Sequence, residues 1–483
     1  MTSTLKHKPA ERPSDHVDPA GAVALRAREA ELLDLEQRYC SHGDTVHYTN
    51  PPKIFESCEG SFLFDMEGRP YLDLQMWYSA VNFGYRNERL DAAVRRQLDR
   101  LPQVASQYLH REKIELATLL ARAAEERFGA KGRIHFNVGG SQAVEDSLKL
   151  VRNAKGGKSL MFAFEGGYHG RTLGASAITS SYRYRRRYGH FGDRAQFIPF
   201  PYHFRGPKGM TKEEYGHHCV KQFERLFESE YNGVWDPKVG EAEYAAFYVE
   251  PIQGTGGYVI PPKNFFVELK RVLDRHGILL VVDEIQMGFY RTGKLFSIEH
   301  FGVSPDVIVF GKAITNGLNP LAGIWAREEL INPQVFPPGS THSTFNANPM
   351  GTGVALETMK MLAETDYESM VMEKGAYLLE GLEDLKRRHK IVGDVDGLGM
   401  ALRIEICEPH DSFTPSKAIV DRMVDEGLKA DLEVDGKKYG LVLDIGGYYK
   451  NVITLAPSLH ISKHEMDLSL QLLDCVMHRV SKQ

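Results

Sequence analysis

Residues 277–317, GILLVVDEIQMGFYRTGKLFSIEHFGVSPDVIVFGKAITNG, decide the fold. Two apolar runs in this stretch, ILLVV and VIVF, have the length and the branched side chains of buried β-strands. Asp283 follows the first run directly, and Lys312 follows the second after a single glycine. Buried strands with polar residues after their carboxyl ends predict a mainly parallel sheet that binds ligands along that edge.

Short apolar runs alternate with longer amphipathic segments on the amino-terminal side of this stretch. RIHFNV (133–138) precedes SQAVEDSLKLVRNA (141–154), and the further runs are SLMFAF (159–164) and AAFYVEP (245–251). This alternation predicts an α/β fold in which helices cover both faces of the sheet.

The composition of the chain changes along its length and predicts four segments. Residues 1–20 are rich in Pro, Lys, Asp and His, which is typical of a disordered tail. Residues 21–75 contain an amphipathic helix and a hairpin-like stretch, and we expect them to pack with a small domain. We expect the large domain to comprise residues 76–345. Residues 346–483, with helices, a strand pair and a final helix, predict a smaller α+β domain.

The bulk properties of the chain exclude several partners. A net charge of -5 does not favour nucleic acid or an anionic membrane. In the segment around Arg183, arginines interleave with tyrosines as in a groove for single-stranded nucleic acid, but we expect a solvated surface or a subunit contact there. The sequence shows no apolar run of membrane-spanning length and no signal-peptide core. Its five cysteines show no metal spacing, so we expect a cytoplasmic protein without a bound metal.

Two candidate binding positions can be argued from the residues alone. Gly140 and Ser141 stand between a strand and a helix, where free N–H groups and the helix dipole suit a phosphate. A glycine turn with a Ser141 helix cap is the alternative. A buried Asp283 is costly unless it pairs with a cation such as a protonated pyridine nitrogen. The alternative for Asp283 is capping of the following turn.

Two further positions offer reactive or stacking groups. Lys312, if held in a pocket with a lowered pKa, would be nucleophilic toward an aldehyde, whereas a surface lysine is the alternative. In FEGGYHGRT (164–172), Tyr168 could stack on a flat cofactor and Arg171 could pair with a carboxylate. Ordinary loop packing is the alternative for Tyr168 and for His169, which has no second metal ligand at a suitable spacing.

Taken together, these motifs resemble the class III aminotransferases, a family of pyridoxal-phosphate enzymes that includes ornithine, acetylornithine and γ-aminobutyrate aminotransferases. The resemblance extends from about residue 50 to the C-terminus. It implies the fold-type I architecture, with a central seven-stranded, mostly parallel sheet, and pyridoxal 5'-phosphate as cofactor. The matching segments are VEPIQGTGG (249–257), VVDEIQMGFYRTGKLF (281–296), PDVIVFGKAITNG (305–317), HSTFNANPM (342–350) and NVITLAPSL (451–459).

The resemblance also implies roles for the residues around the cofactor ring. Lys312 would form a Schiff base with the cofactor and later move the proton at the substrate carbon. Asp283 would pair with the pyridine nitrogen, and Gln286 would hydrogen-bond the phenolic oxygen. Tyr168 would stack on the ring, so we count Lys312, Asp283 and Tyr168 as the expected catalytic residues.

The remaining implied roles concern the phosphate and the substrate. Gly140 and Ser141 would bind the phosphate within one subunit. Thr344 would reach the phosphate of the neighbouring subunit, which implies a homodimer with shared active sites. Arg171 would contact a substrate carboxylate.

Departures from the family pattern point to an unusual substrate. Thr255 stands where many members have a glutamate, and Thr454 stands where many have the arginine that binds an α-carboxylate. The segment Asn82–Asn87 also differs from the family's histidine-containing motif. We therefore expect an amine, an ω-amino compound or another unusual amino compound as donor. Trp77 and Tyr78 are expected to line its pocket, with core packing as the alternative.

The resulting hypothesis is an aminotransferase that works in two half-reactions, with a 2-oxo acid or aldehyde as acceptor. Relatives of the same fold with other chemistry remain alternatives, because a decarboxylase, racemase, aminomutase or phospho-lyase would also need Lys312 and Asp283. A cofactor-binding protein without activity is the other alternative.

Overall fold

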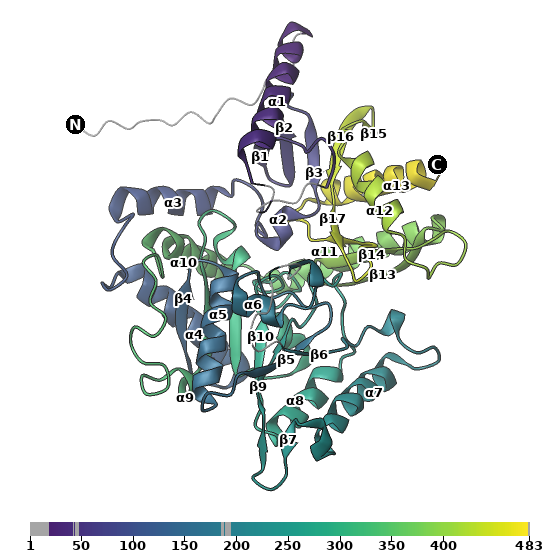
Figure 1. The fold of residues 1–483 in the computed structure, drawn as a ribbon. Helices are drawn as coiled ribbons and strands as arrows, with labels where there is room; N and C mark the ends of the chain where they lie inside the picture. The colour runs from purple at the N-terminus through teal and green to yellow at the C-terminus, as the bar shows by residue number, and fades with distance from the viewer. Residues whose placement is uncertain (1–18, 42, 44–47, 185–187, 189–194, 482–483) are drawn as a thin grey trace, which may run out of the picture.

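The computed structural model describes residues 19–41, 43, 48–184, 188 and 195–481 (Figure 1). Its central sheet has seven strands in the order β4-β12-β11-β10-β9-β5-β6. β12 runs antiparallel to both neighbours, and the other neighbouring strands are parallel. The α/β fold with a mostly parallel seven-stranded sheet is therefore confirmed. The strands are β4 (Gly132–Asn137), β5 (Leu160–Phe164), β6 (Gln196–Ile198), β9 (Tyr244–Val249), β10 (Leu279–Asp283), β11 (Val307–Phe310) and β12 (Ala322–Arg327).

Helices cover both faces of this sheet because its strands are apolar on both sides. On β10, Val281 belongs to the apolar cluster that contains Val144 of α5, whereas Val282 belongs to the cluster that contains Leu269 of α8. Successive strand residues point to opposite faces, so α5 and α8 cover opposite sides. The helices of this region are α3 (Glu88–Arg100), α4 (Arg111–Phe128), α5 (Gly140–Ala154), α6 (Leu173–Ile178), α7 (Lys212–Glu224), α8 (Phe265–Arg275), α9 (Glu328–Ile331) and α10 (Pro349–Glu364).

A second sheet joins the two ends of the chain. Its order is β1-β2-β3-β16-β15, and β3 pairs in parallel with β16 (Figure 1). The hairpin-like stretch of the sequence forms β2 and β3, which are antiparallel. The N-terminal segment thus contacts the C-terminal region through backbone hydrogen bonds, while the four-segment division stays a prediction. The elements are α1 (Pro19–Tyr39), β1 (Phe55–Glu59), β2 (Phe62–Asp65), β3 (Pro70–Asp73), α2 (Met76–Ser79), β15 (Leu432–Val434) and β16 (Lys437–Val442).

The C-terminal region contains an antiparallel sheet in the order β13-β14-β18-β17. Arg403 on β14 is in register with Thr454 on β18, which is in register with Asp444 on β17. Three side chains that matter below therefore lie in one row across the sheet. The elements are α11 (Tyr367–Arg388), β13 (Val392–Leu398), β14 (Ala401–Ile406), α12 (Lys417–Gly427), β17 (Asp444–Gly446), β18 (Val452–Leu455) and α13 (Lys463–Ser481).

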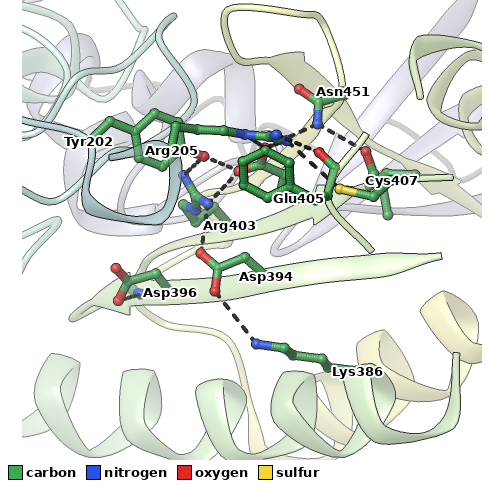
Figure 2. Close-up of polar contacts among 12 residues, drawn as sticks. Tyr202, Arg205, Lys386, Asp394, Asp396, Arg403, Glu405, Cys407 and Asn451 are labelled. Atoms are coloured by element: carbon green, nitrogen blue, oxygen red, sulfur yellow. Dashed lines mark hydrogen bonds and ion pairs between the residues drawn. The ribbon is translucent and has the colours of Figure 1, made fainter. Parts of the chain in front are cut away.

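A buried group of charged side chains connects β14 to the loop that follows β6 (Figure 2). The guanidinium of Arg403 lies 2.7 Å from a Glu405 oxygen, 2.9 Å from Asp394 and 2.6 Å from the hydroxyl of Tyr202. Arg205 donates a second charged hydrogen bond to Glu405, at 2.8 Å. We call these five residues the Arg403–Glu405 network. Its charges are neutralised within the chain.

Several expectations concern the surface and the ends of the chain. Among the described residues, no helix combines the length and apolar character needed to cross a membrane. The predicted tail lies almost entirely outside the described residues, as do three of the arginines after Arg183, and α1 begins at Pro19.

The short elements of the structure are β7 (Trp235–Asp236), β8 (Glu241–Ala242) and the 3₁₀ helices η1 (Tyr182–Tyr184), η2 (His203–Arg205), η3 (Arg225–Phe227), η4 (Glu230–Asn232), η5 (Ser297–Phe301) and η6 (Lys312–Thr315).

Candidate active site

A cavity of about 210 Å³ lies at the carboxyl ends of the central strands. Asp283 is the last residue of β10, and Lys312 begins η6 directly after β11. Tyr168 lies in the loop after β5, and Gly140 begins α5 after β4. The structure therefore brings together residues that are far apart in the sequence, as the strand-end argument predicted. Those sharing the cavity wall are Gly140, Ser141, Tyr168, Asp283, Gln286 and Lys312.

Asp283 is held in one orientation by two neighbours. One carboxylate oxygen lies 2.9 Å from Nδ1 of His169, and the other accepts a hydrogen bond from the backbone N–H of Ile285 at 3.1 Å. Asp283 is 5% exposed and His169 is 2% exposed. Burial alone would lower the pKa of His169, but its hydrogen bond to Asp283 and the charge of that carboxylate raise it. The two contacts thus fix the orientation of the Asp283 carboxylate.

Lys312 is half-buried and faces several carboxylates. Burial lowers the pKa of its amine, and the negative charges of Asp283, Glu250 and Asp444 oppose this shift. A lowered pKa increases the fraction of neutral, nucleophilic amine. Its backbone has a φ of 46°, a left-handed conformation that is costly for a residue with a side chain. Strain at this position fits a reactive residue rather than a surface lysine.

Glu250 is a buried carboxyl next to this centre that the sequence reasoning did not identify. Its two oxygens accept hydrogen bonds from the backbone N–H of Tyr168, at 2.9 Å, and of Gly254, at 3.0 Å. Burial raises the pKa of Glu250 to about 7, and the charge of Asp283 adds to the shift. Glu250 therefore fixes the loop that carries Tyr168.

The amino end of α5 provides a polar corner of the cavity. No side chain caps this end, and the backbone hydrogen bonds of the helix begin with Ala143, which donates to Gly139 at 3.0 Å. Early N–H groups of a 15-residue helix can therefore bind an anion. A Cβ on Gly140 would lie only 2.8 Å from Cδ1 of Ile285, so a larger residue there would require the end of the Ile285 side chain to move.

This donor set fits pyridoxal phosphate. A helix end with free N–H groups suits the phosphate, a buried carboxylate suits a protonated ring nitrogen, and an amine of lowered pKa suits the aldehyde carbon. The structure provides the three at one cavity through Gly140 and Ser141, Asp283, and Lys312.

A second cavity of about 200 Å³ adjoins the first and shares Tyr168, Gln286 and Lys312 with it. Two expected substrate residues, Tyr78 and Arg171, line this cavity. The guanidinium of Arg171 stacks on Tyr184, 4.7 Å from its ring centroid. The sequence reasoning did not identify Tyr48, Asp444 or Lys450, which also line it.

Trp77 and Tyr78 belong to a left-handed turn. All four residues of α2, Met76–Ser79, have positive φ angles between 44° and 63°. The left-handed conformation costs roughly 1–2 kcal/mol for each residue with a side chain. Tyr78 faces the second cavity, whereas Trp77 is 55% exposed and is not part of either cavity wall.

Thr344 lies apart from the two cavities around Lys312. It lines a separate surface cavity of about 760 Å³, together with Phe345 and Pro349. In the single chain, Thr344 is therefore no part of the wall around Lys312. Its expected contact with a neighbouring subunit stays a prediction.

Comparison with known proteins agrees with this geometry. The family "Aminotransferase class-III" matches residues 45–477. Curated relatives include an alanine/serine racemase from Pyrococcus horikoshii, 32% identical, with coverage of 92% of this chain and 90% of that protein. The 5-aminovalerate aminotransferase DavT of Pseudomonas aeruginosa is 30% identical, with coverage of 87% and 92%.

Among solved structures, an (S)-enantioselective omega-transaminase from Thermomicrobium roseum is 28% identical and superposes with a TM-score of 0.82. The alignment covers 93% of this chain and 98% of that one. The expected fold type, enzyme class and cofactor are thus confirmed. The chain belongs to the class III aminotransferases, a family of pyridoxal-phosphate-dependent enzymes.

Proposed function

We propose that this protein transfers an amino group from an amine, ω-amino or unusual amino compound to a 2-oxo acid or aldehyde. The observation that carries the proposal is the half-buried Lys312, which shares a cavity with the Asp283–His169 pair and has an amine of lowered pKa. The second cavity, reached from the same lysine, gives the substrate a place beside the cofactor.

Each residue then has a definite task. When bound, pyridoxal phosphate supplies a carbonyl that condenses with amines and a ring that withdraws electrons. Lys312 would hold it covalently and, once displaced, accept and return the proton of the substrate carbon. Asp283, oriented by His169, would keep the ring nitrogen protonated. Gly140 and Ser141 would bind the phosphate.

The proposal includes a homodimer in which Thr344 completes the phosphate site of the other subunit. Its support is the position of Thr344 on a surface cavity, away from Lys312 of its own chain. Measurement of the molar mass in solution tests the dimer. A Thr344→Ala variant should keep the dimer and bind pyridoxal phosphate more weakly.

Racemisation is a second candidate, favoured by two relatives that are an alanine/serine racemase and a leucine/methionine racemase. Both reactions remove a proton from the substrate carbon. A racemase returns the proton to that carbon and leaves the cofactor unchanged. An aminotransferase leaves the cofactor as its amine form after the donor alone.

The test is a panel of amines and amino acids added singly to the holoenzyme, with the visible absorbance of the cofactor as readout. Chromatography of the released cofactor then identifies the amine form, and chiral analysis of the substrate detects inversion. Transamination predicts the amine form with at least one donor. An unchanged cofactor together with inverted substrate would support racemisation instead.

Two variants test the role of Lys312. Lys312→Ala should lower the rate of amino transfer by at least about 1000-fold, because the residue that moves the proton is lost. Lys131→Ala, at an exposed lysine that lines neither cavity, is the matched control and should react as the wild type does. Equal bleaching of the cofactor by donors in both variants would remove Lys312 from the mechanism.

A further inference from the structure

A buried carboxylate without a cation forms part of the wall of the second cavity. Asp444 is 9% exposed and accepts a hydrogen bond from the Thr454 hydroxyl at 2.8 Å. Its other oxygen lies 3.3 Å from both the Tyr48 hydroxyl and Nε2 of Gln75. These three donors are neutral, so none of them offsets the negative charge.

The cations around Asp444 are too far away to form ion pairs with it. Among the described residues, no Lys, Arg or His nitrogen lies within 4.0 Å of its oxygens, although Arg171, Arg183 and Lys450 line the same cavity. Burial raises the pKa of Asp444, and the hydrogen bonds from Thr454 and Gln75 only oppose that shift. A buried charge that lacks a partner is costly, so a cation that enters the cavity would stabilise the charged form of Asp444.

The neighbouring strands β18 and β14 place no free cationic side chain in register with Asp444. Thr454, which occupies the position of the family's carboxylate-binding arginine, is in register with Asp444. Arg403 follows in the same row, but its guanidinium binds Glu405 and Asp394. The subsite that would carry a positive charge thus carries a negative one.

Asp73 provides an internal comparison. It is also buried, and its donors among the described residues are likewise neutral, namely the N–H groups of Gln75 and Met76, at 2.7 and 2.9 Å, and the hydroxyl of Tyr85. However, Asp73 is not part of the cavity wall, and its backbone bonds hold the start of α2. Asp444 combines the lack of an ion pair with access to the cavity that Lys312 shares.

We infer that Asp444 binds a second ammonium group on the amino donor, so that the donor is a diamine or a diamino acid. The inference deepens the proposed function and rests on it. One amino group of the donor reacts at Lys312, and the other pairs with Asp444. Arg171 and Lys450, on the same cavity wall, provide positive charge for the carboxylate of a diamino acid.

Matched pairs of donors test this role in the full-length holoenzyme. Putrescine is compared with pentylamine, in which a methyl group replaces the second ammonium. Ornithine is compared with δ-aminovalerate, which lacks the α-amino group. In the wild type, kcat/KM should be at least tenfold higher for the member with two ammonium groups, in at least one of the pairs. The favoured pair tells a diamine from a diamino acid.

Asp444→Asn removes the charge and keeps the shape of the side chain. It should lower the preference within the favoured pair at least tenfold, mainly through KM. The preference is a ratio, so any effect of the lost charge on Lys312, which both donors share, cancels in it. Asp73→Asn is the matched control, since it removes a buried carboxylate outside the cavity and should change both members of a pair equally. Thr454→Arg, which gives Asp444 a partner within the chain, should abolish the preference as well.

The failure of this inference differs from the failure of the proposed function. If donors react but Asp444→Asn leaves the preference unchanged, Asp444 has no role in recognition. If no donor transfers its amino group, the proposed function fails. In that case titration of the holoenzyme with putrescine and pentylamine, read by cofactor absorbance, tests Asp444 alone. Equal affinities in wild type and Asp444→Asn would then overturn the inference.

Discussion

Glu405 on β14 and Asp444 on β17 are buried carboxylates of the same four-stranded sheet, separated by the strand β18. Glu405 lies between two guanidinium groups, those of Arg403 and Arg205 (Figure 2). Within the described part of the chain, Asp444 receives hydrogen bonds only from neutral side chains and the backbone, and it borders a cavity. The fold therefore neutralises one charge and leaves the other to be neutralised by a ligand.

This difference separates two uses of buried charge. In the Arg403–Glu405 network, opposite charges meet in good geometry and join the sheet to the loop after β6, so the network contributes to the architecture. Asp444 has no ion-pair partner among the described residues. The loss of its hydration on folding therefore destabilises the protein. A buried charge that the protein leaves unpaired beside a cavity is a better guide to function than a paired one.

The largest expected effect comes from breaking the paired region. Arg403→Met should cost about 3 kcal/mol of stability, because it leaves Glu405 buried with only Arg205 as its cation. Urea unfolding monitored by circular dichroism measures the change. The double variant Arg403→Met with Glu405→Gln should recover part of the loss. No recovery would mean that lost packing, rather than unpaired charge, causes the effect.

A smaller effect of opposite sign is expected at the unpaired carboxylate. Asp444→Asn should stabilise the protein by roughly 1 kcal/mol near neutral pH, since the variant no longer desolvates a charge that the chain leaves unpaired. Burial raises the pKa of Asp444 in the folded state, so its protonated form favours folding and stability falls as pH rises through that pKa.

The gain from Asp444→Asn should therefore vanish in acid, below the usual range of aspartate, and grow as pH rises. Unfolding curves of both proteins at a series of pH values measure the difference. A gain of the same size at every pH would show that the charge of Asp444 does not destabilise the fold. The comparison with Glu405 would then lose its basis.

The smallest effect is expected at the rim of the Arg403–Glu405 network. Lys386 lies 3.5 Å from Asp394 and is one-third exposed, so solvent screens the pair (Figure 2). Lys386→Ala should change stability by at most about 0.5 kcal/mol, which the same urea unfolding measures. A loss comparable to that of Arg403→Met would place the energy of the network at its rim instead of its core.

The fold could be predicted from the sequence because its strongest signals are local. The runs that end at Asp283 and just before Lys312 are apolar on both faces, which is typical of strands inside a parallel sheet. The helical segment that follows Gly140 alternates with such apolar runs, as is typical of an α/β fold. The pairing of β3 with β16 was not visible, because parallel pairing of segments so far apart leaves no local pattern.

The residues of the candidate site likewise fall into those that local sequence signals identified and those that they did not. Ser141, Tyr168, Asp283 and Lys312 were identified because each follows a predicted strand, and such ends meet at one edge of a sheet. Asp444 was missed because nothing near it in the sequence marks it as facing the cavity. Its bond to Thr454 depends on the pairing of β17 with β18. The threonine at position 454, where the family resemblance implies an arginine, was the available signal. The sequence did not show that Thr454 contacts Asp444.

The left-handed turn Met76–Ser79 has a consequence for any attempt to engineer the substrate range. A substitution at Tyr78 alters the backbone energy of the turn as well as the shape of the cavity, because side chains without branching are tolerated best at positive φ. Glycine at Tyr78 would relax the turn and enlarge the cavity at once. Valine or isoleucine there would add backbone strain to any gain in fit. Variant libraries for this wall are therefore best built from glycine and unbranched residues.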